Sequence, residues 1–549
     1  MTADERSARE PATQSVATRK SILVCVLFFM LVPTVAHWQF SWMGFTPTDE
    51  GYVLMYSRRL LAGQIPHRDF ISEKPVLSPL LHVPEVALGG DYTFWISRFV
   101  VWFQFAVLGW AWAELLISLL LPRRDPLHVA AFALLVFLFS SNTFPAIAWQ
   151  TIDGLFLLSL GLLLRVRLSR FSFLAYFLIG AAYLCKQTFG VAFIGALIAL
   201  GDWRRPRYWL AALLPAMMYC GFLICVGGLP DAVVQLTAQR GIIGPGIRSY
   251  VYSPFVAWGV LAGVGLGWLL GLGRAVQSTV ALWLASVGIS ICALELMRGM
   301  YRFGENAGYG LFGVALGLVV SSLARGQSTA VVRAGLLAVT TAWCTSISVG
   351  FNSPNLAAGP LVSFVLIAVI AGTIPRIANR KVSQAVITVI VISLFSFAVA
   401  RRHWIYRDAP AIKLTGNLDG VFPGAKFIRT NANTLEYLED LQVAIGRVYG
   451  KRYIILPDTA GYWVKSGQLN PISIDWPLSI ELANNRLVHR VERDLGQQKG
   501  EAAILLEKVA VEDLAAGFHP LLAEHYPILP YVHENFRKVD ETKFFDILE

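Results

Sequence analysis

The sequence is short of charged residues and of cysteines. Only 15% of its 549 residues are Asp, Glu, Lys or Arg, whereas 55% are hydrophobic; soluble domains carry about a quarter charged residues. A chain with so little charge cannot solvate its own surface in water, which excludes a soluble enzyme, a disordered chain and a fibre. The six cysteines all lie in apolar runs and form no CxxC pair, which excludes a disulfide framework and a CxxC metal site.

The positive charge of the chain is confined to its first part. The formal net charge is +10, yet from Arg402 onward there are 17 Lys and Arg against 20 Asp and Glu. The basic excess before Arg402 lies mostly in short loops between apolar runs, where such residues set the orientation of a membrane protein. The sequence therefore predicts a membrane partner and no nucleic acid.

Long apolar runs occupy most of the chain up to residue 401. The first run, from Ser21 to Phe40, lacks a small-x-small cleavage site, so we interpret it as a membrane span rather than a signal peptide. Further runs are centred near residues 107, 136, 159, 178, 195, 218, 264, 287, 316, 341, 367 and 392. The predicted fold is a polytopic α-helical membrane protein with about thirteen transmembrane helices, followed by an extracytoplasmic α/β domain.

Loop charges predict how these parts lie across the membrane. Basic residues gather in alternate loops, on the side of the N-terminus, which places residues 1–20 in the cytoplasm. Residues 21–401 then form the membrane domain, with a long first outer loop at 41–92, and residues 402–549 form a domain outside the cell membrane. Within that domain two buried strands are expected, at residues 452–456 and 502–506, and a helix at residues 434–448.

The first outer loop concentrates polar residues. Its start can form a short helix whose apolar residues, including Val53 and Leu54, rest on the membrane while Arg58 and Arg59 reach toward lipid phosphates. Its cations stand on the outer side, against the usual charge bias, which suggests that they serve an anion.

An ordered string of residues follows the first apolar run: Asp49, Glu50, Tyr52, Arg58, Leu61, Gly63, Pro66, Asp69, Phe70, Lys74 and Pro75. This order resembles that of the membrane-embedded GT-C glycosyltransferases, in particular the dolichyl-phosphate-mannose-protein mannosyltransferase-like and aminoarabinose-transferase-like enzymes. The resemblance covers about thirty residues, and the predicted architecture fits as well. Two positions depart from the pattern: His67 replaces a frequent aromatic residue and Val76 a second proline.

The resemblance implies transfer of a sugar from a polyprenyl-phosphate carrier to a hydroxyl on the outer face of the membrane, with inversion at the anomeric carbon. A hydroxyl is a poor nucleophile, so a nearby carboxylate should take its proton; Asp49 is the expected base and Glu50 its partner. The leaving lipid phosphate gathers negative charge, which a fixed cation stabilises, and Lys74 is the first candidate for that cation.

Other residues are candidates for binding. Lys186, Arg302 and Arg58 are further candidates for the donor phosphate. Asp153, His67 and Asp69 are candidate contacts to the acceptor, the donor or a metal; Asp49 and Asp153 alone are too few hard ligands to infer a metal, so no metal or other cofactor is predicted.

Two other functions are compatible with the same features. One is a transporter or flippase of lipid-linked saccharides, although paired, related halves are not visible in the sequence. The other is a polysaccharide polymerase or ligase, for which the dominant outer loop would be expected late in the chain. The expected partners of a glycosyltransferase are a polyprenyl-phosphate-linked sugar, membrane lipids and a glycan, lipid or protein acceptor, at the cell membrane.

Overall fold

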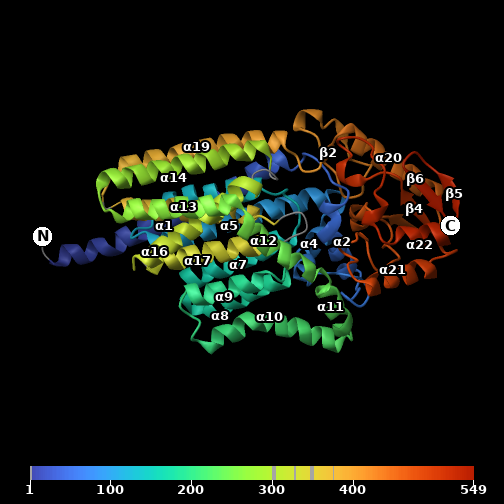
Figure 1. Cartoon of the computed structure of the whole chain (residues 1–549), viewed down its shortest axis with the longest axis horizontal. Helices are drawn as coiled ribbons and strands as arrows, with labels where there is room; N and C mark the ends of the chain where they lie inside the picture. Colours follow the sequence, from blue (N-terminus) through green and yellow to red (C-terminus); the bar gives the residue numbers. More distant parts are fainter. Residues whose placement is uncertain (1–2, 300–303, 327–328, 347–351, 375) are drawn as a thin grey trace.

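The computed structural model describes residues 3–299, 304–326, 329–346, 352–374 and 376–549. A long bundle of helices makes up most of the molecule, and a smaller domain with a β-sheet, the tail domain, sits on one end of it (Figure 1). The N-terminus lies at the opposite end of the bundle from this domain.

The bundle is built from helices that follow the apolar runs of the sequence. Three short helices form the first outer loop, between the first and second long helices: α2 (Asp49–Leu61), α3 (Leu77–Leu81) and α4 (Val83–Leu88). The other helices of the bundle are α1 (Ala3–Phe40), α5 (Thr93–Leu120), α6 (Pro126–Asn142), α7 (Gln150–Arg167), α8 (Ser172–Ala181), α9 (Phe189–Ala199), α10 (Pro206–Cys225), α11 (Leu229–Leu236), α12 (Ile243–Tyr252), α13 (Pro254–Gly271), α14 (Ala275–Glu295), α16 (Tyr309–Ala324), α17 (Thr329–Thr345), α18 (Ala358–Thr373) and α19 (Asn379–His403).

The number of helices able to cross a membrane differs from the prediction. Within the described residues, eight helices are long and apolar enough to do so, not thirteen. Four of the predicted runs form helices of only 10–17 residues, whereas a span needs about 20 residues at 1.5 Å each. A fifth run forms α7, which carries Asp153, Arg165 and Arg167. The apolar runs therefore located the helices correctly, but their number exceeds the number of helices that are long and apolar enough to cross a membrane.

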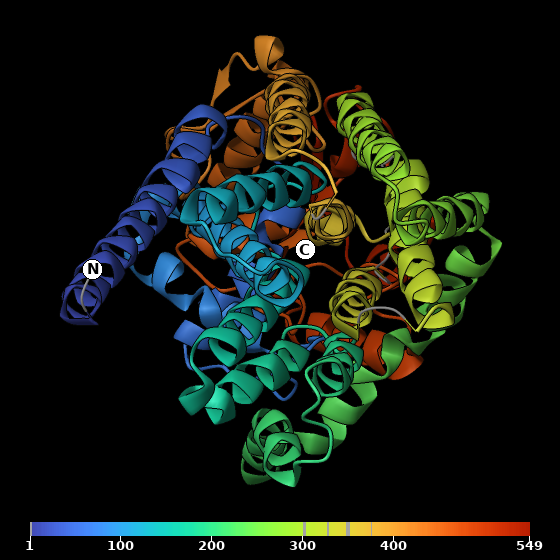
Figure 2. The same cartoon turned by 90° about the vertical axis from the view of Figure 1, so that its left-hand side faces the viewer.

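The helices at the periphery of the bundle expose apolar side chains, whereas the helices at its centre bury them. Buried residues make up 89% of the apolar windows of α5 and α18, but only 22% of that of α1 and 17% of that of α13. Seen along the bundle, α1 lies on the periphery (Figure 2). Large apolar residues such as Met30, Trp258 and Phe395 are more than half exposed. Water would not solvate such a surface, so the chain is a membrane-embedded helical protein.

The tail domain is a small mixed sheet with helices. Its strands β3, β4, β6 and β5 lie in that order; β3 and β4 are parallel, and the other two pairs are antiparallel. The predicted strands and helix are confirmed by β3, β4 and α20. The elements are β1 (Gly416–Asn417), β2 (Arg429–Thr430), α20 (Ala432–Arg447), β3 (Arg452–Leu456), η9 (Ala460–Val464), α21 (Asn485–Gln497), β4 (Ala502–Glu507), α22 (Leu529–Asn535), β5 (Lys538–Glu541) and β6 (Phe545–Leu548).

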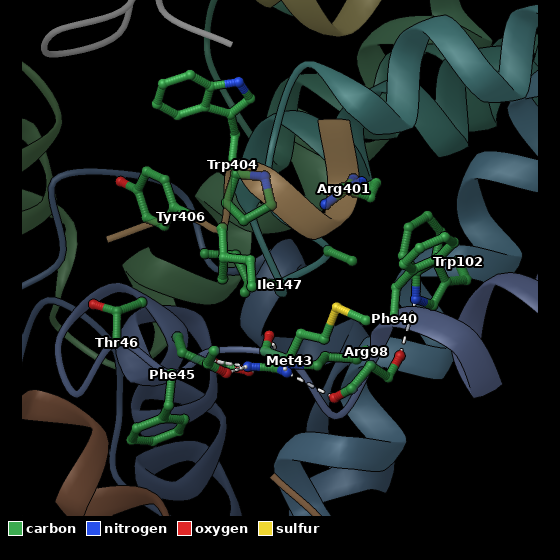
Figure 3. A pocket seen from close by; sticks show the side chains of 16 residues that line it. Phe40, Met43, Phe45, Thr46, Arg98, Trp102, Ile147, Arg401, Trp404 and Tyr406 are labelled. Carbon is green, nitrogen blue, oxygen red and sulfur yellow. Dashed lines mark hydrogen bonds and ion pairs between the residues drawn. The ribbon is translucent and has the colours of Figure 1, made fainter. Parts of the chain in front are cut away.

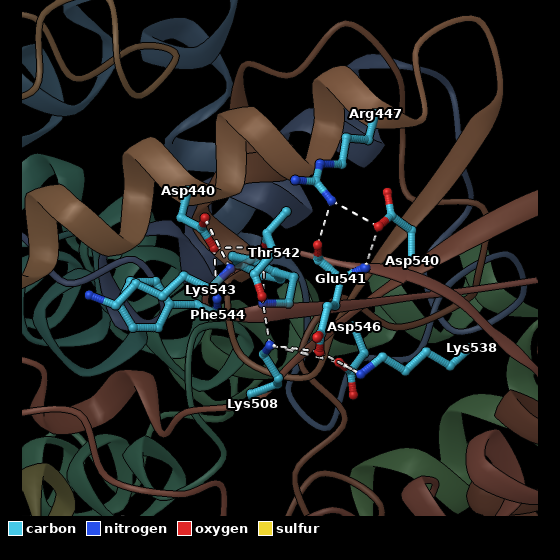
Figure 4. Close-up of polar contacts among 11 residues, drawn as sticks. Asp440, Arg447, Lys508, Lys538, Asp540, Glu541, Thr542, Lys543, Phe544 and Asp546 are labelled. Carbon is cyan, nitrogen blue, oxygen red and sulfur yellow. Dashed lines mark hydrogen bonds and ion pairs between the residues drawn. The ribbon is translucent and has the colours of Figure 1, made fainter.

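Polar contacts hold the β5–β6 hairpin against α20 at the far edge of the tail domain (Figure 4). Asp440 accepts hydrogen bonds from the Thr542 hydroxyl at 2.7 Å and from the Phe544 amide at 2.7 Å. Lys538 bridges Glu541 and Asp546 at 2.6 and 2.8 Å, with its own side chain half exposed. Exposed ion pairs of this kind contribute about 0–1 kcal/mol each, so the contacts order the hairpin more than they stabilise the domain.

The tail domain covers helix α2. Tyr52, Val53 and Leu54 have at most 1% of their surface exposed, and they share one apolar cluster with residues of the tail domain. Gly51 of α2 packs directly on Gly461 of η9: a Cβ atom added to Gly51 would lie 2.1 Å from the Gly461 Cα. The expectation that α2 rests on the membrane surface is therefore wrong, because its apolar residues are buried beneath protein rather than lipid.

Candidate functional site at the outer end of the bundle

Asp49 begins helix α2 and is buried at the junction with the tail domain. It is 3% exposed, and its Oδ2 accepts a hydrogen bond of 2.8 Å from the Tyr406 hydroxyl. The Arg407 Nη1 lies 3.0 Å from the same oxygen. Burial raises the pKa of Asp49, and the Arg407 guanidinium opposes that shift. A buried carboxylate with a raised pKa is a stronger proton acceptor than a solvated one, as a general base requires.

Glu50 faces a different partner. Its carboxylate binds Arg98 of α5 through two contacts, of 2.5 Å to Nε and 2.6 Å to Nη2. Arg98 also donates to the carbonyl oxygens of Ser41 at 2.7 Å and Gly44 at 2.6 Å. This pair ties the start of the first outer loop to α5. Both carboxylate oxygens of Glu50 are therefore occupied by a bidentate ion pair, and this structural contact disfavours the catalytic role predicted for Glu50.

Lys74 lies in a compact group of buried charges. Its Nζ is 2.5 Å from Glu73 Oε1 and 5.5 Å from the centre of the Tyr52 ring. Glu481, from the loop before α21, closes the group from the side of the tail domain, and Tyr52 donates a hydrogen bond to Glu73. Burial and the Glu73 charge hold the pKa of Glu481 well above its usual range, whereas Lys74 lowers the pKa of Glu73 to about 2 against the effect of burial.

Lys186 is buried without an acidic partner. Its Nζ donates to the Ser346 carbonyl at 2.9 Å and the Thr151 hydroxyl at 3.2 Å, and no carboxylate of the described residues lies within ion-pairing distance. The adjacent Gln187 donates to the Glu73 carbonyl at 3.2 Å, which fastens this turn to the loop that carries Lys74. The structure thus brings the two predicted lysines into one neighbourhood and leaves Lys186 as the one whose charge is not neutralised by a carboxylate.

A row of aromatic rings links Asp49 to the lysines. Tyr406, which binds Asp49, lies 6.4 Å from Phe144 between ring centres; Phe144 lies 5.6 Å from Trp149, and Trp149 lies 5.5 Å from Tyr52. Tyr52 is one helical turn after Asp49 on α2 and contacts the ammonium group of Lys74. The carboxylate and the cations therefore border the same stretch of aromatic surface.

An apolar groove lies next to the segments that carry Lys74 and Lys186, although neither lysine lines it. It encloses about 940 Å³ and runs between α3, α8 and α10. Val76 and Leu77, which line it, follow Lys74 by two and three residues, and Leu184 precedes Lys186 by two. The groove opens where α10 exposes apolar side chains, among them Met218 at 60%. A lipid chain can enter such a groove from the bilayer.

Asp153 is held in a separate buried network. Its Oδ1 accepts from Gln104 Nε2 at 2.7 Å and lies 3.1 Å from His82 Nε2, and its Oδ2 accepts from the Ser78 hydroxyl. His82 also contacts Glu85 through Nδ1 at 2.7 Å. Burial alone would lower the pKa of His82, but Asp153 and Glu85 raise it to about 10. Both oxygens of Asp153 have protein donors, so the geometry favours a structural role over the predicted contact with a ligand.

The other predicted residues are scattered. Both ring nitrogens of His67 are bound, to Gln235 at 2.8 Å and Tyr219 at 2.7 Å, which fits a loop anchor better than a ligand contact. Asp69 pairs with Arg68 on the surface at 2.8 Å. Arg58 is half-buried on α2. Arg302 lies outside the described residues.

No known protein family, curated protein or solved structure matches the chain. Within the described part of the chain, no group of three or more His, Cys, Asp or Glu side chains is placed to hold a metal ion. The site is therefore interpreted from its own geometry.

Sequence reasoning missed the partners that complete the site. Arg407 and Tyr406 follow the last helix of the bundle, Arg98 lies in α5, and Glu481 belongs to the tail domain. Arg59 was expected to face lipid, but it is 2% exposed and binds Asp475 of the tail domain through two contacts, of 2.6 and 2.8 Å. The one signal that could have drawn attention to Arg407 is its place in the polar segment directly after the last span, and the sequence prediction did not include it.

Proposed function

We propose that the chain is an integral-membrane glycosyltransferase that transfers a sugar from a polyprenyl phosphate to a hydroxyl acceptor at the outer face of the membrane. The observation that carries the proposal is the apolar groove lined by residues that flank Lys74 and Lys186 in the sequence. Such a groove suits a long hydrocarbon chain, and the proposal places the phosphate of that lipid at the buried ammonium groups of the two flanking segments. The resemblance of the Asp49–Pro75 loop to GT-C enzymes gives the same reaction class.

The residues divide the chemistry as follows. The acceptor oxygen attacks the anomeric carbon, and the bond from that carbon to the phosphate oxygen breaks with its electron pair left on the phosphate. Asp49 takes the acceptor proton, and burial has raised its pKa above the usual value of a carboxyl group. Lys186 stabilises the charge that develops on the phosphate. No carboxylate is paired with its ammonium group, so no neighbouring negative charge offsets its attraction for the phosphate.

Lys74 has a secondary part in this assignment. Its ammonium group is already bound to Glu73, so its attraction for a phosphate is reduced by the neighbouring carboxylate. We propose that it positions Tyr52 and the Glu73 loop and contributes to the positive field next to Lys186. This reverses the predicted order of the two lysines.

The proposal is tested by mass spectrometry of envelope glycans from cells that carry the wild-type chain, Asp49→Asn or the exposed control Asp91→Asn. We expect a glycan modification that depends on the wild-type protein, persists with Asp91→Asn and falls by about 10²–10⁴-fold in rate with Asp49→Asn, at equal protein levels in the membrane. A modification that survives Asp49→Asn unchanged would remove Asp49 as the base.

A second measurement separates transfer from transport. Purified protein in vesicles would be supplied with a polyprenyl-phosphate-linked sugar. Movement of the intact lipid-linked sugar across the bilayer, with no new glycosidic bond, would contradict the proposal in favour of a flippase.

A further inference from the structure

A second pocket lies on the other side of the Asp49–Glu50 turn from the lysines. About 500 Å³ of empty space, part of it open to the surroundings, lies between the ends of α1, α5 and α19 and the loop after α6. Figure 3 shows Arg401 of α19 on one side of this pocket and Arg98 of α5 on the other, with Met43 and Ile147 between them. Nothing in the proposed transfer reaction uses this pocket.

The two arginines of the pocket differ in whether a carboxylate neutralises their charge. Arg98 is neutralised by Glu50. Arg401 donates through Nη2 to the carbonyl oxygens of Ser141 and, at 2.9 Å, Phe144 at the end of α6. Its Nε is buried and has no hydrogen-bond partner, and no carboxylate of the described residues pairs with it. The pocket thus holds one net positive charge and an unused buried donor, and leaving such a donor unmet is costly.

The surroundings of Arg401 indicate the height of the pocket in the bilayer. Arg401, Arg402 and His403 form the last turn of α19, and the next residue, Trp404, is 50% exposed. Trp38, near the end of α1, is 72% exposed. Exposed tryptophans beside basic residues at the end of a span mark the level of the lipid headgroups.

The ring faces around Arg401 complete the wall of the pocket. Its guanidinium carbon lies 4.9 Å from the centre of the Trp102 ring and 5.8 Å from that of Phe397. Stacking of this kind holds the planar guanidinium in one orientation.

We infer that this pocket binds the phosphate of an anionic lipid headgroup from the outer leaflet, with Arg401 as the ligand. Phosphate suits the planar donor edge of a guanidinium, and the position among interface tryptophans favours a lipid over a soluble phosphate. The site is independent of the proposed sugar transfer. It borders Tyr406, the hydrogen-bond partner of Asp49.

The test is native mass spectrometry of the full-length protein, stripped of lipid in detergent and titrated with phosphatidylglycerol, phosphatidylcholine or inorganic phosphate. We expect selective retention of phosphatidylglycerol. Arg401→Gln should weaken this retention by about tenfold or more, the loss of one charge-assisted contact. Arg402→Gln removes the same charge one residue away, where the side chain is exposed, and should change retention by less than about twofold.

A pocket-filling variant keeps the test valid if Arg401→Gln does not fold. Ile147→Phe leaves every charge in place but narrows the pocket, and it should also reduce retention. Inorganic phosphate that binds as tightly as the lipid would support the anion site and make soluble phosphate its source. Equal retention of the two lipids, unchanged binding in Ile147→Phe, or equal losses in Arg401→Gln and Arg402→Gln would overturn the inference.

Discussion

Glu50 and Asp49 are neighbours in sequence, but their surroundings give them different tasks. Glu50 neutralises the buried Arg98, so Glu50→Gln should leave a guanidinium uncompensated in a nearly dry site. Breaking such a pair by removing one member costs about 3–5 kcal/mol. We expect a marked fall in the midpoint of thermal unfolding of the purified protein, whereas Asp69→Asn, which alters an exposed pair, should change the stability by less than about 1 kcal/mol.

The double change Glu50→Met with Arg98→Met sharpens this experiment. Removing both charges also removes the uncompensated one, so the double variant should be more stable than Glu50→Gln. A Glu50→Gln protein that unfolds at the wild-type temperature but has lost activity would contradict the structural role and restore Glu50 to the catalytic one.

The sequence singled out candidate residues of the first outer loop, but not what they contact. Asp49 and Lys74 stood out because they belong to the ordered string that resembles GT-C enzymes, and Lys74 also because cations on the predicted outer side oppose the usual charge bias. Their partners lie far along the chain: Arg407 is more than 350 residues after Asp49, and Glu481 more than 400 after Lys74. Contacts between residues so far apart in the chain produce no periodic pattern in the local sequence, so a single sequence could not predict them.

Helix α2 and η9 cross at a point where neither can carry a side chain. A Cβ at Gly51 would lie 2.1 Å from the Gly461 Cα, and one at Gly461 would lie 2.6 Å from the Pro47 carbonyl. Gly51→Ala should therefore push the tail domain off α2 and destabilise the protein by about 1–3 kcal/mol. Limited proteolysis should release the tail domain faster. The control Gly446→Ala, in α20 with open space around it, should be neutral or stabilising by up to about 1 kcal/mol.

Local patterns predicted secondary structure better than they predicted burial. Four consecutive apolar or β-prone residues, Tyr453 to Leu456, gave β3, and helical spacing gave α20 to within two residues at its start. For α2 the same reasoning found the helix but assigned it the wrong surroundings, because an apolar face has the same sequence pattern whether lipid or a folded domain covers it. Tyr52 and Arg59 are covered by the tail domain. This contact belongs to the tertiary structure, so the local sequence pattern could not predict it.

The two ends of the bundle differ in charge. Ion pairs join Lys20 to Asp125 in the loop before α6, and Arg165 and Arg205 to Asp202 in the loop before α10, which are loops on the predicted cytoplasmic side. The N-terminus lies at the end of the bundle opposite the tail domain. The tail domain occupies the other end. Eight crossings would return the chain to its starting side, whereas the last helix ends beside the tail domain. We therefore expect the shorter apolar helices to add further crossings, either as single helices or as two short helices in series. The total number of crossings is then odd.

This arrangement predicts that position 449 faces the outside of the cell and position 274 the cytoplasm. The tail domain has no cysteine of its own, and Tyr449 is 94% exposed. Tyr449→Cys should react with a membrane-impermeant maleimide in intact cells, above the wild-type signal from the native cysteines. Arg274→Cys, in the exposed loop between α13 and α14, should react only after the cells are permeabilised, because basic loops stay inside. Labelling of both positions in intact cells, or of neither, would place the two ends of the bundle on one side of the membrane. In that case Asp49 would be on the cytoplasmic side together with the basic loops, or those loops would be outside.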